Sequence, residues 1–146
     1  MAFWLLKSEP DVFSWHDQVA LGAKGGEWHG VRNYQARNNM RAMAVGERAL
    51  FYHSRAPAAQ GGPAVVGLVE VTAPAHPDST AGDDARWDCV DVRALRPLPR
   101  PVALSRIRAE PALAGMVLVR NSRLSVQPVT DEEWRLVCAL SGALPD

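Results

Sequence analysis

Aromatic, basic and amide side chains are concentrated in residues 28–41, which read WHGVRNYQARNNMR without any acidic residue. Such a mixture is suited to holding a nucleobase, because a ring can stack on the base, amides can bind its edge and guanidiniums can contact phosphates. Trp28 and Tyr34 are the rings. The candidate contacts to the nucleic-acid backbone are Arg32, Arg37 and Arg41. This segment is therefore the first candidate for a functional site.

Three further polar clusters stand where strands or helices are expected to end. They are residues 7–10 (KSEP), 51–54 (FYHS) and 121–128 (NSRLSVQP). Taken singly, each feature has an ordinary explanation: Trp28 could be a core aromatic, His53 a buried imidazole with its hydrogen bonds satisfied, and the strand near Ser125 a solvent-facing edge. Taken together, the clusters could supply the walls of a pocket around the aromatic segment.

Motifs for several other chemistries are missing from the chain. There is no phosphate loop, dinucleotide fingerprint, zinc-binding pair or serine-hydrolase elbow, and the four histidines fall on four different expected elements. Cys89 and Cys138 lie among apolar neighbours, which predicts buried thiols in a reducing compartment. We therefore expect no catalytic residue, no cofactor and no metal. The alternative is a small hydrolase or deaminase acting on modified nucleosides, with Glu9 or His53 as acid or base and Lys7 positioning the substrate.

Length and charge restrict the function further. The 146 residues make one domain of ordinary size, and 16 basic residues balance 16 acidic ones. A neutral chain does not bind nucleic acid through net charge, so binding would depend on local patches such as Arg93, Arg96 and Arg100. The apolar run at the start is too short for a signal sequence, and no stretch has membrane-spanning length. The expected location is cytoplasmic, with no membrane partner.

Hydrophobic patterning predicts an α+β domain. Strands are expected at residues 2–7, 47–54, 64–71, 86–95 and 123–127, a polyproline-like edge at 96–101, and loops at 55–63 and 73–84. Helices are expected at 14–22, 33–43 and 130–142, with broken helical turns at 104–115. Ser14 and Thr130 are each followed three residues later by an acidic residue, which is the signature of a capping box. This order favours a bent mixed sheet or small barrel flanked by short helices over a doubly wound parallel sheet.

The last predicted strand, residues 123–127, alternates in polarity. Leu124 and Val126 are expected to face the core, whereas Arg123, Ser125 and Gln127 are expected on the polar side. The polar side would then be available to a ligand.

Several of these motifs resemble those of the EVE domain family, which belongs to the PUA-like superfamily and includes eukaryotic thymocyte nuclear protein. The matching segments are residues 4–10 (WLLKSEP), 28–43, 51–54 (FYHS), 67–71 (GLVEV) and 122–130 (SRLSVQPVT). The resemblance covers nearly the whole chain and implies a single domain over residues 1–146. It also implies a nucleic-acid-binding module that recognises a modified base, above all methylated or hydroxymethylated cytosine in DNA.

The resemblance implies a set of base-binding residues. They are Lys7, Ser8, Glu9, Trp28, Arg32, Asn33, Tyr34, His53, Ser54, Arg123, Leu124, Ser125 and Gln127. Trp28 would supply the stacking face, and its position just before Gly30 favours a ring displayed at a cavity mouth rather than packed in the core. A PUA-type RNA-binding module remains an alternative, because one contact to a 2′-hydroxyl separates RNA from DNA. The partner is then a nucleic acid with a modified base, and a protein partner that the sequence does not identify stays open.

Overall fold

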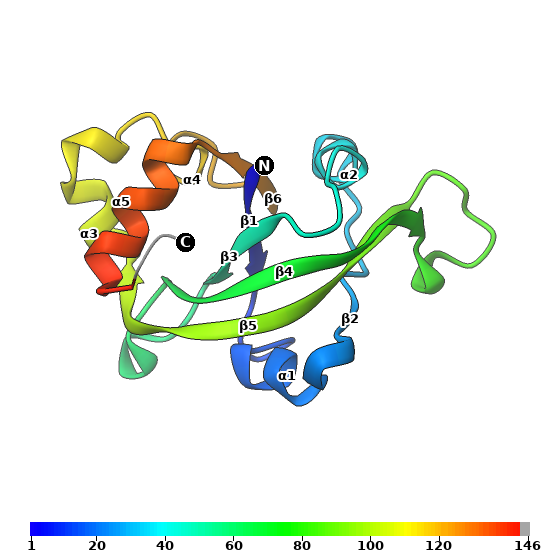
Figure 1. The fold of residues 1–146 in the computed structure, drawn as a ribbon, viewed down its shortest axis with the longest axis horizontal. Helices are drawn as coiled ribbons and strands as arrows, with labels where there is room; N and C mark the ends of the chain where they lie inside the picture. The colour runs from blue at the N-terminus through cyan, green and yellow to red at the C-terminus, as the bar shows by residue number, and fades with distance from the viewer. Residues whose placement is uncertain (144–146) are drawn as a thin grey trace.

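A six-stranded mixed sheet forms the centre of the computed structural model, which describes residues 1–143 (Figure 1). Its strands are β1 (Phe3–Ser8), β2 (Gly26–Glu27), β3 (Arg48–His53), β4 (Ala64–Pro77), β5 (Asp88–Ala103) and β6 (Val126–Val129), in the order β2-β5-β4-β3-β1-β6. The α-helices are α1 (Trp15–Ala20), α2 (Tyr34–Arg41), α3 (Leu104–Ala109), α4 (Val117–Arg120) and α5 (Asp131–Ser141). Short 3₁₀ turns are η1 (Gly22–Lys24), η2 (Ala58–Gln60), η3 (Ser79–Ala81) and η4 (Pro111–Leu113). Strands β1 and β3 are parallel, and the other neighbours are antiparallel.

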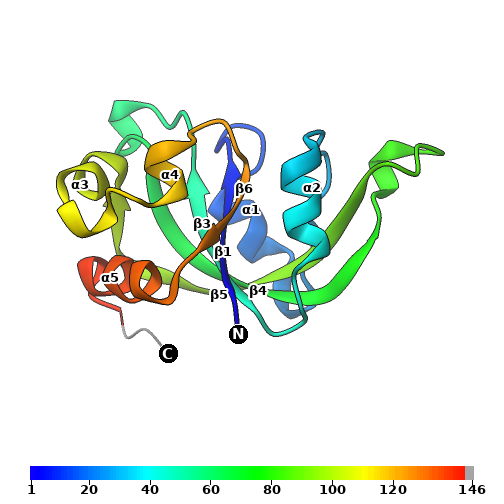
Figure 2. The same cartoon turned by 90° about the horizontal axis from the view of Figure 1, so that it is seen from above.

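The sheet is strongly bent. Strands β4 and β5 pair as one long hairpin whose register shifts several times, and Figure 2 shows this hairpin as an arch. Register shifts of this kind mark β-bulges or similar irregularities, which increase the local twist and bend a strand. The predicted bent mixed sheet is confirmed, but among the described residues the strand order stays open, with β2 and β6 at its two edges, rather than closed as a barrel.

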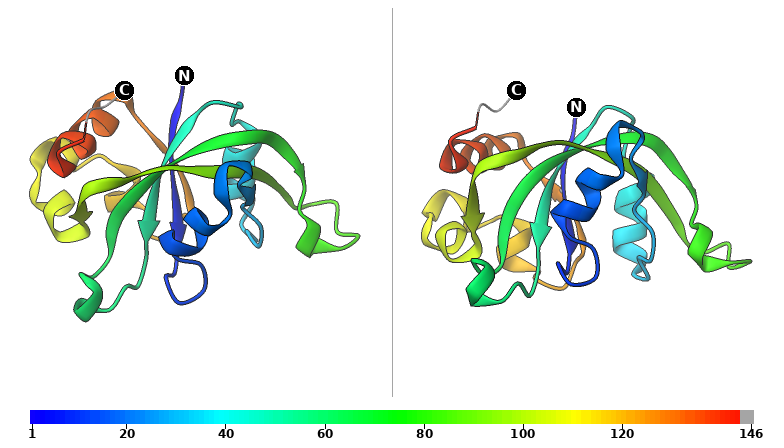
Figure 3. Two further views of the ribbon diagram at one scale, coloured as in Figure 1. Left: turned by 60° about the horizontal axis from the view of Figure 1, so that its bottom comes forward. Right: turned by 90° about the horizontal axis from the view of Figure 1, so that it is seen from below.

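Alternating side chains give the sheet two apolar faces. Leu5 and Leu50 belong to a buried cluster with Trp134 of α5, whereas Leu6 and Phe51 belong to a second cluster together with α2. Helices α3, α4 and α5 therefore cover one face, and α1 and α2 lie over the other (Figure 3). No helix within residues 1–143 is long and apolar enough to cross a membrane.

Local sequence signals set the helix starts. The Ser14 hydroxyl accepts the Asp17 N–H (3.1 Å), and the Thr130 hydroxyl accepts the Glu133 N–H (3.1 Å), so both predicted capping boxes are confirmed. Asn33 caps α2 by accepting the Ala36 N–H at 2.8 Å. The Asn33 cap fixes the start of α2, the helix that carries Tyr34, Arg37 and Arg41.

Two predicted connections are instead part of the long hairpin. Strand β4 continues through Pro77 into the expected loop at 73–84, and β5 continues through the expected polyproline edge at 96–101. Proline is tolerated there because neighbouring strands stop early: β3 pairs with β4 only as far as Glu70, and β2 pairs with β5 only at Asp91 and Val92. Beyond these points each strand has a free edge that needs no N–H donor.

Both cysteines are buried, as expected. Cys89 of β5 lies in the apolar cluster that α2 covers, and Cys138 of α5 lies in the cluster on the other face of the sheet. They are on opposite faces of the sheet and form no disulfide with each other.

Candidate nucleic-acid interface

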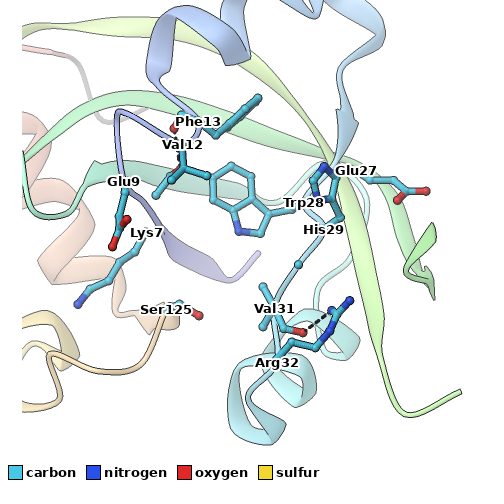
Figure 4. A pocket seen from close by; sticks show the side chains of 12 residues that line it. Lys7, Glu9, Val12, Phe13, Glu27, Trp28, His29, Val31, Arg32 and Ser125 are labelled. Atoms are coloured by element: carbon cyan, nitrogen blue, oxygen red, sulfur yellow. Dashed lines mark hydrogen bonds between the residues drawn. The ribbon is translucent and has the colours of Figure 1, made fainter. Parts of the chain in front are cut away.

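A cavity of about 620 Å³ opens between the end of β1 and the segment that follows β2 (Figure 4). It is lined by Lys7, Ser8, Glu9, Val12, Phe13, Glu27, Trp28, His29, Gly30, Val31, Arg32 and Ser125. Three stretches distant in sequence therefore meet: residues 7–13, residues 27–32 and the loop before β6.

The end of β1 forms one wall of this cavity. The Lys7 N–H donates to the Ser125 carbonyl at 2.9 Å, which joins the wall to the loop before β6. The Ser8 hydroxyl donates to the Phe13 carbonyl at 2.6 Å, and the Phe13 N–H donates to the Glu9 carbonyl at 2.9 Å. These bonds close a tight turn that places Phe13 against the cavity.

Trp28 forms the opposite wall. Its backbone N–H donates to the Val90 carbonyl at 2.8 Å. Its indole packs edge to face on Phe13 and Phe51, with ring centroids 5.9 and 5.5 Å away. Only 7% of the residue is exposed, so the expectation that this ring is displayed rather than packed is wrong. Trp28 belongs to the core and also lines the cavity.

The indole nitrogen of Trp28 is available to a ligand. It makes no hydrogen bond to any residue within 1–143, and Figure 4 shows it on the side of the ring that faces Val31. The Ser125 hydroxyl, which lines the same cavity, likewise has no hydrogen-bond partner among the described residues. The cavity thus offers two polar groups beside the apolar surfaces of Val12 and Phe13.

Asp78 anchors the segment that carries Trp28. Its carboxylate accepts the Gly30 N–H (2.8 Å), an Arg32 guanidinium N–H (3.2 Å), and both the N–H (2.8 Å) and the hydroxyl (2.6 Å) of Thr80. Burial acts to raise the pKa of Asp78, but the hydrogen bonds from Thr80, Gly30 and Arg32 outweigh it and lower the pKa to about 2. Asp78 is therefore ionised at neutral pH and holds this wall to the β4–β5 hairpin.

The arginines predicted to contact phosphates are already engaged within the protein. Arg32 pairs with Asp78, and Arg41 Nε lies 2.8 Å from an Asp88 carboxylate oxygen. Arg37 donates to the Arg86 carbonyl at 2.9 Å and lies over the Tyr34 ring at 4.8 Å. The carboxylates beside Arg32 and Arg41 partly cancel the positive charge of this patch.

A second hollow of about 720 Å³ adjoins the cavity and is richer in cations. The two share Lys7, Ser8, Glu9 and Ser125, and the second adds Ser54, Arg55, Ser122 and Arg123. Lys7 Nζ donates to the Ser122 carbonyl, and burial lowers its pKa. Arg123 has no ion pair within residues 1–143, and Arg55 lies 3.5 Å from Glu9 with 85% of its side chain exposed. Two cations with a long ion pair or none among the described residues, Arg55 and Arg123, therefore lie beside the cavity rather than on α2.

The implied base-binding residues divide into three groups. Those that line the cavity are Lys7, Ser8, Glu9, Trp28, Arg32 and Ser125. Ser54 and Arg123 line only the adjoining hollow. Neither space is lined by Asn33, Tyr34, His53, Leu124 or Gln127.

Three of the residues outside these spaces have clear structural roles. His53 Nε2 accepts the Trp15 N–H at 3.0 Å, and burial lowers its pKa, so the ring is a neutral acceptor. Tyr34 stacks on Trp87 with centroids 5.0 Å apart. Asn33, as noted, caps α2.

The predicted alternation of residues 123–127 holds for Val126, which is in the core, but β6 begins only at Val126, and Gln127 does not lie on a solvent-accessible polar side. Gln127 pairs in register with Leu5, whose side chain belongs to the cluster beneath α5, and it is fully buried. Its amide donates to the Leu124 carbonyl at 2.7 Å. Leu124 is in the core, as predicted.

Sequence reasoning missed several residues of the site. The cavity-lining residues that were not proposed are Val12, Phe13, Glu27, His29, Gly30 and Val31. Asp78 was also missed, although Asp followed by Ser and Thr in a predicted loop is typical of a turn in which the carboxylate binds nearby backbone N–H groups.

Comparison with known proteins finds relatives of the same fold. The EVE domain model matches residues 2–140. A crystal structure from Agrobacterium tumefaciens has a TM-score of 0.93 at 54% identity and covers 98% of this chain and 94% of that chain. Human thymocyte nuclear protein 1 is 36% identical over 172 residues, which cover 97% of this chain and 75% of the human protein.

Two neighbours are known in complexes with modified nucleic acids. The human protein bound to DNA containing 5-methylcytosine has a TM-score of 0.87 at 36% identity, covering 97% of this chain and 98% of that one. A YTH domain from Zygosaccharomyces rouxii, bound to N6-methyladenosine RNA, has a TM-score of 0.58 at 17% identity and covers 98% and 88%. The YTH likeness is one of fold alone.

Proposed function

The chain belongs to the EVE domain family, and from that premise we propose that it reads a modified base in nucleic acid, with 5-methylcytosine in DNA as the ligand. The observation that carries the proposal is the cavity beside Trp28, which joins apolar walls to unused polar groups. The human relative's complex with 5-methylcytosine DNA supports the choice of base.

The cavity has the size and lining that a flipped base needs. Its volume of about 620 Å³ falls within the range of roughly 300–1,000 Å³ found for small-molecule sites. Val12, Phe13 and Val31 offer apolar surface to the base and its methyl group. The Trp28 indole N–H and the Ser125 hydroxyl can bind the polar edge of the base.

The energies of these contacts predict moderate selectivity. Flipping a base costs a few kcal/mol, which base–aromatic contact of about 1–3 kcal/mol and two hydrogen bonds can offset. Burying one methyl group contributes only about 0.8 kcal/mol, or roughly a fourfold preference. Stronger preference for the methylated base would require a closely shaped apolar niche.

Phosphates next to the flipped base would lie in the adjoining hollow. Arg123 and Arg55 are its most available cations, and Lys7 links it to the cavity. Arg32, Arg37 and Arg41 would then contribute at the rim only by exchanging their internal partners for phosphates.

Fluorescence anisotropy with four matched oligonucleotides tests this function. The set is DNA and RNA of one sequence, each with a single cytosine or 5-methylcytosine. We expect the tightest binding to methylated DNA, and Ser125→Ala to weaken it severalfold. Ser105→Ala, on the exposed side of α3, is the matched control and should leave affinity unchanged.

Other outcomes of this panel would redirect the proposal. Tighter binding of either RNA would favour the PUA-type RNA-binding alternative. Chemical change of the oligonucleotides, seen by mass spectrometry and abolished by Glu9→Gln, would favour the hydrolase or deaminase alternative.

A further inference from the structure

Four side chains with metal-ligand chemistry lie close together on neighbouring strands. Glu27 of β2 pairs in register with Asp91 of β5, and His76 of β4 pairs in register with Cys89 of β5. Directly paired residues share a face of the sheet, and so do residues two apart on one strand, such as Cys89 and Asp91. The strand pairing therefore brings a thiol, an imidazole and two carboxylates to one place.

The donor atoms are near enough to share an ion. One ligand atom from each of Glu27, His76 and Cys89 lies within 4.8 Å of the other two. His76 Nε2 is 3.9 Å from Cys89 Sγ and 2.7 Å from an Asp91 carboxylate oxygen. This group differs from a simple acidic cluster because it contains sulfur and nitrogen donors as well as carboxylates.

Two further contacts orient these donors. His76 Nδ1 lies 3.1 Å from the Pro77 carbonyl, which can hold a proton on Nδ1, whereas Nε2 donates to Asp91 at 2.7 Å and would give up that proton to ligate an ion. The Glu27 carboxylate accepts the Ser79 hydroxyl at 2.6 Å. Outer contacts of this kind fix the tautomer and orientation of ligands in metal sites.

We propose that Glu27, His76 and Cys89, together with Asp91, bind a zinc ion. A set of one sulfur, one nitrogen and two oxygen donors suits tetrahedral Zn²⁺, whereas Mg²⁺ and Ca²⁺ take oxygen ligands. Zinc–ligand bonds of about 2.0–2.3 Å imply donors roughly 3.3–3.7 Å apart. The Glu27, His76 and Cys89 donors must therefore move somewhat closer together. The hydrogen-bonded His76 and Asp91 atoms, 2.7 Å apart, must separate. Binding releases the thiol proton, because the thiolate is the ligand.

The ion would stabilise a wall of the base cavity. Glu27 lines that cavity and directly precedes Trp28, and its zinc ligation would tie β2 to the β4–β5 hairpin. Metal binding can be measured without nucleic acid, so its outcome is independent of the proposed function.

Cobalt titration of the full chain, after chelator treatment and dialysis, tests the site. We expect one Co²⁺ per chain, with the visible spectrum of tetrahedral cobalt and a thiolate-to-cobalt charge-transfer band, both removed by one equivalent of Zn²⁺. Cys89→Ser should abolish the charge-transfer band, and His76→Ala should weaken binding at least tenfold. Cys138→Ser and His16→Ala are matched controls, because Cys138 is buried on the other face of the sheet and His16 is exposed on α1.

Three results would overturn the proposal: no charge-transfer band in the wild type, an equal band in folded Cys89→Ser, or a band lost in Cys138→Ser. Should Cys89→Ser fail to fold, Glu27→Gln and Asp91→Asn provide a second test at the oxygen ligands. Each should then weaken cobalt binding at least tenfold in a protein with wild-type circular dichroism. Unchanged affinity in both variants would also contradict the site.

Discussion

Replacing Trp28 should weaken both folding and binding. The indole is 7% exposed and makes two edge-to-face contacts, with Phe13 and Phe51. Truncation of such a ring to alanine costs about 3–5 kcal/mol of unfolding free energy, a large part of the roughly 5–15 kcal/mol that stabilises a domain. Trp28→Ala alone therefore cannot separate a pocket residue from a core residue.

Trp28→Phe is the more informative change. Phenylalanine keeps an aromatic ring against Phe13 and Phe51 but removes the indole N–H and one ring of packing. We expect the unfolding free energy to fall by about 1–2 kcal/mol. Loss of one hydrogen bond, about 0.5–1.5 kcal/mol, should weaken binding of methylated DNA by about 2- to 10-fold.

Trp134→Phe is the matched control for this experiment. Trp134 is buried on the opposite face of the sheet, where it stacks on Phe3 at 4.3 Å. Its replacement should lower the urea midpoint without changing the anisotropy titration of the folded protein. The pocket assignment of Trp28 would be refuted if both variants lost similar stability and bound the methylated oligonucleotide with wild-type affinity.

Three further predictions concern charge, pH and packing. Arg123→Ala should weaken DNA binding severalfold and reduce the salt dependence of affinity by about one phosphate. Arg41→Ala removes a cation that is already paired within the protein, so it should change both quantities less. Equal effects of the two substitutions would argue against the hollow as the phosphate site. Burial acts to raise the pKa of Glu47, but hydrogen bonds from two backbone N–H groups and the Trp4 indole outweigh burial and lower the pKa. The ionised Glu47 therefore stabilises the folded state above the unfolded pKa, and this contribution is lost as pH falls through the folded pKa. Glu47→Gln should accordingly lower the unfolding free energy at neutral pH by about 1–3 kcal/mol, measured by urea denaturation. The difference from wild type should shrink as pH falls through the folded pKa of Glu47, and a difference independent of pH would contradict the assignment. A methyl group on Gly67 would approach the Trp15 ring to 2.5 Å, so Gly67→Ala should destabilise the fold by about 1–3 kcal/mol. Gly115 has open space around it, so Gly115→Ala should change the urea midpoint much less. Equal midpoints for the two variants would be inconsistent with this packing.

Features of the fold that depend on adjacent residues were predictable from the sequence. The capping boxes at Ser14 and Thr130 are local hydrogen-bonding patterns, and the strand positions follow hydrophobic alternation. The full length of β4 and β5 was not predictable, because proline normally argues against a strand. Whether Pro97 is acceptable depends on where the neighbouring strand stops, which is decided by the tertiary fold.

The site was predictable only in part, for the same reason. The resemblance to a family indicated Lys7, Ser8 and Trp28, and the structure brings them to one cavity. The partner of Arg32 is Asp78, 46 residues away, so no local pattern shows that this cation is already paired. The zinc ligands proposed here were missed because strand register, rather than a spaced motif, brings His76 and Cys89 together.

The most direct test of the central claim follows the indole N–H signals of ¹⁵N-labelled protein during titration with methylated DNA. The chain has five tryptophans, and the Trp28 and Trp134 signals can be assigned from the two phenylalanine variants. The account predicts a large shift of the Trp28 Nε1–H signal, larger with 5-methylcytosine than with cytosine, and an unchanged Trp134 signal. A saturating titration that leaves the Trp28 signal in place would contradict binding of the base in this cavity.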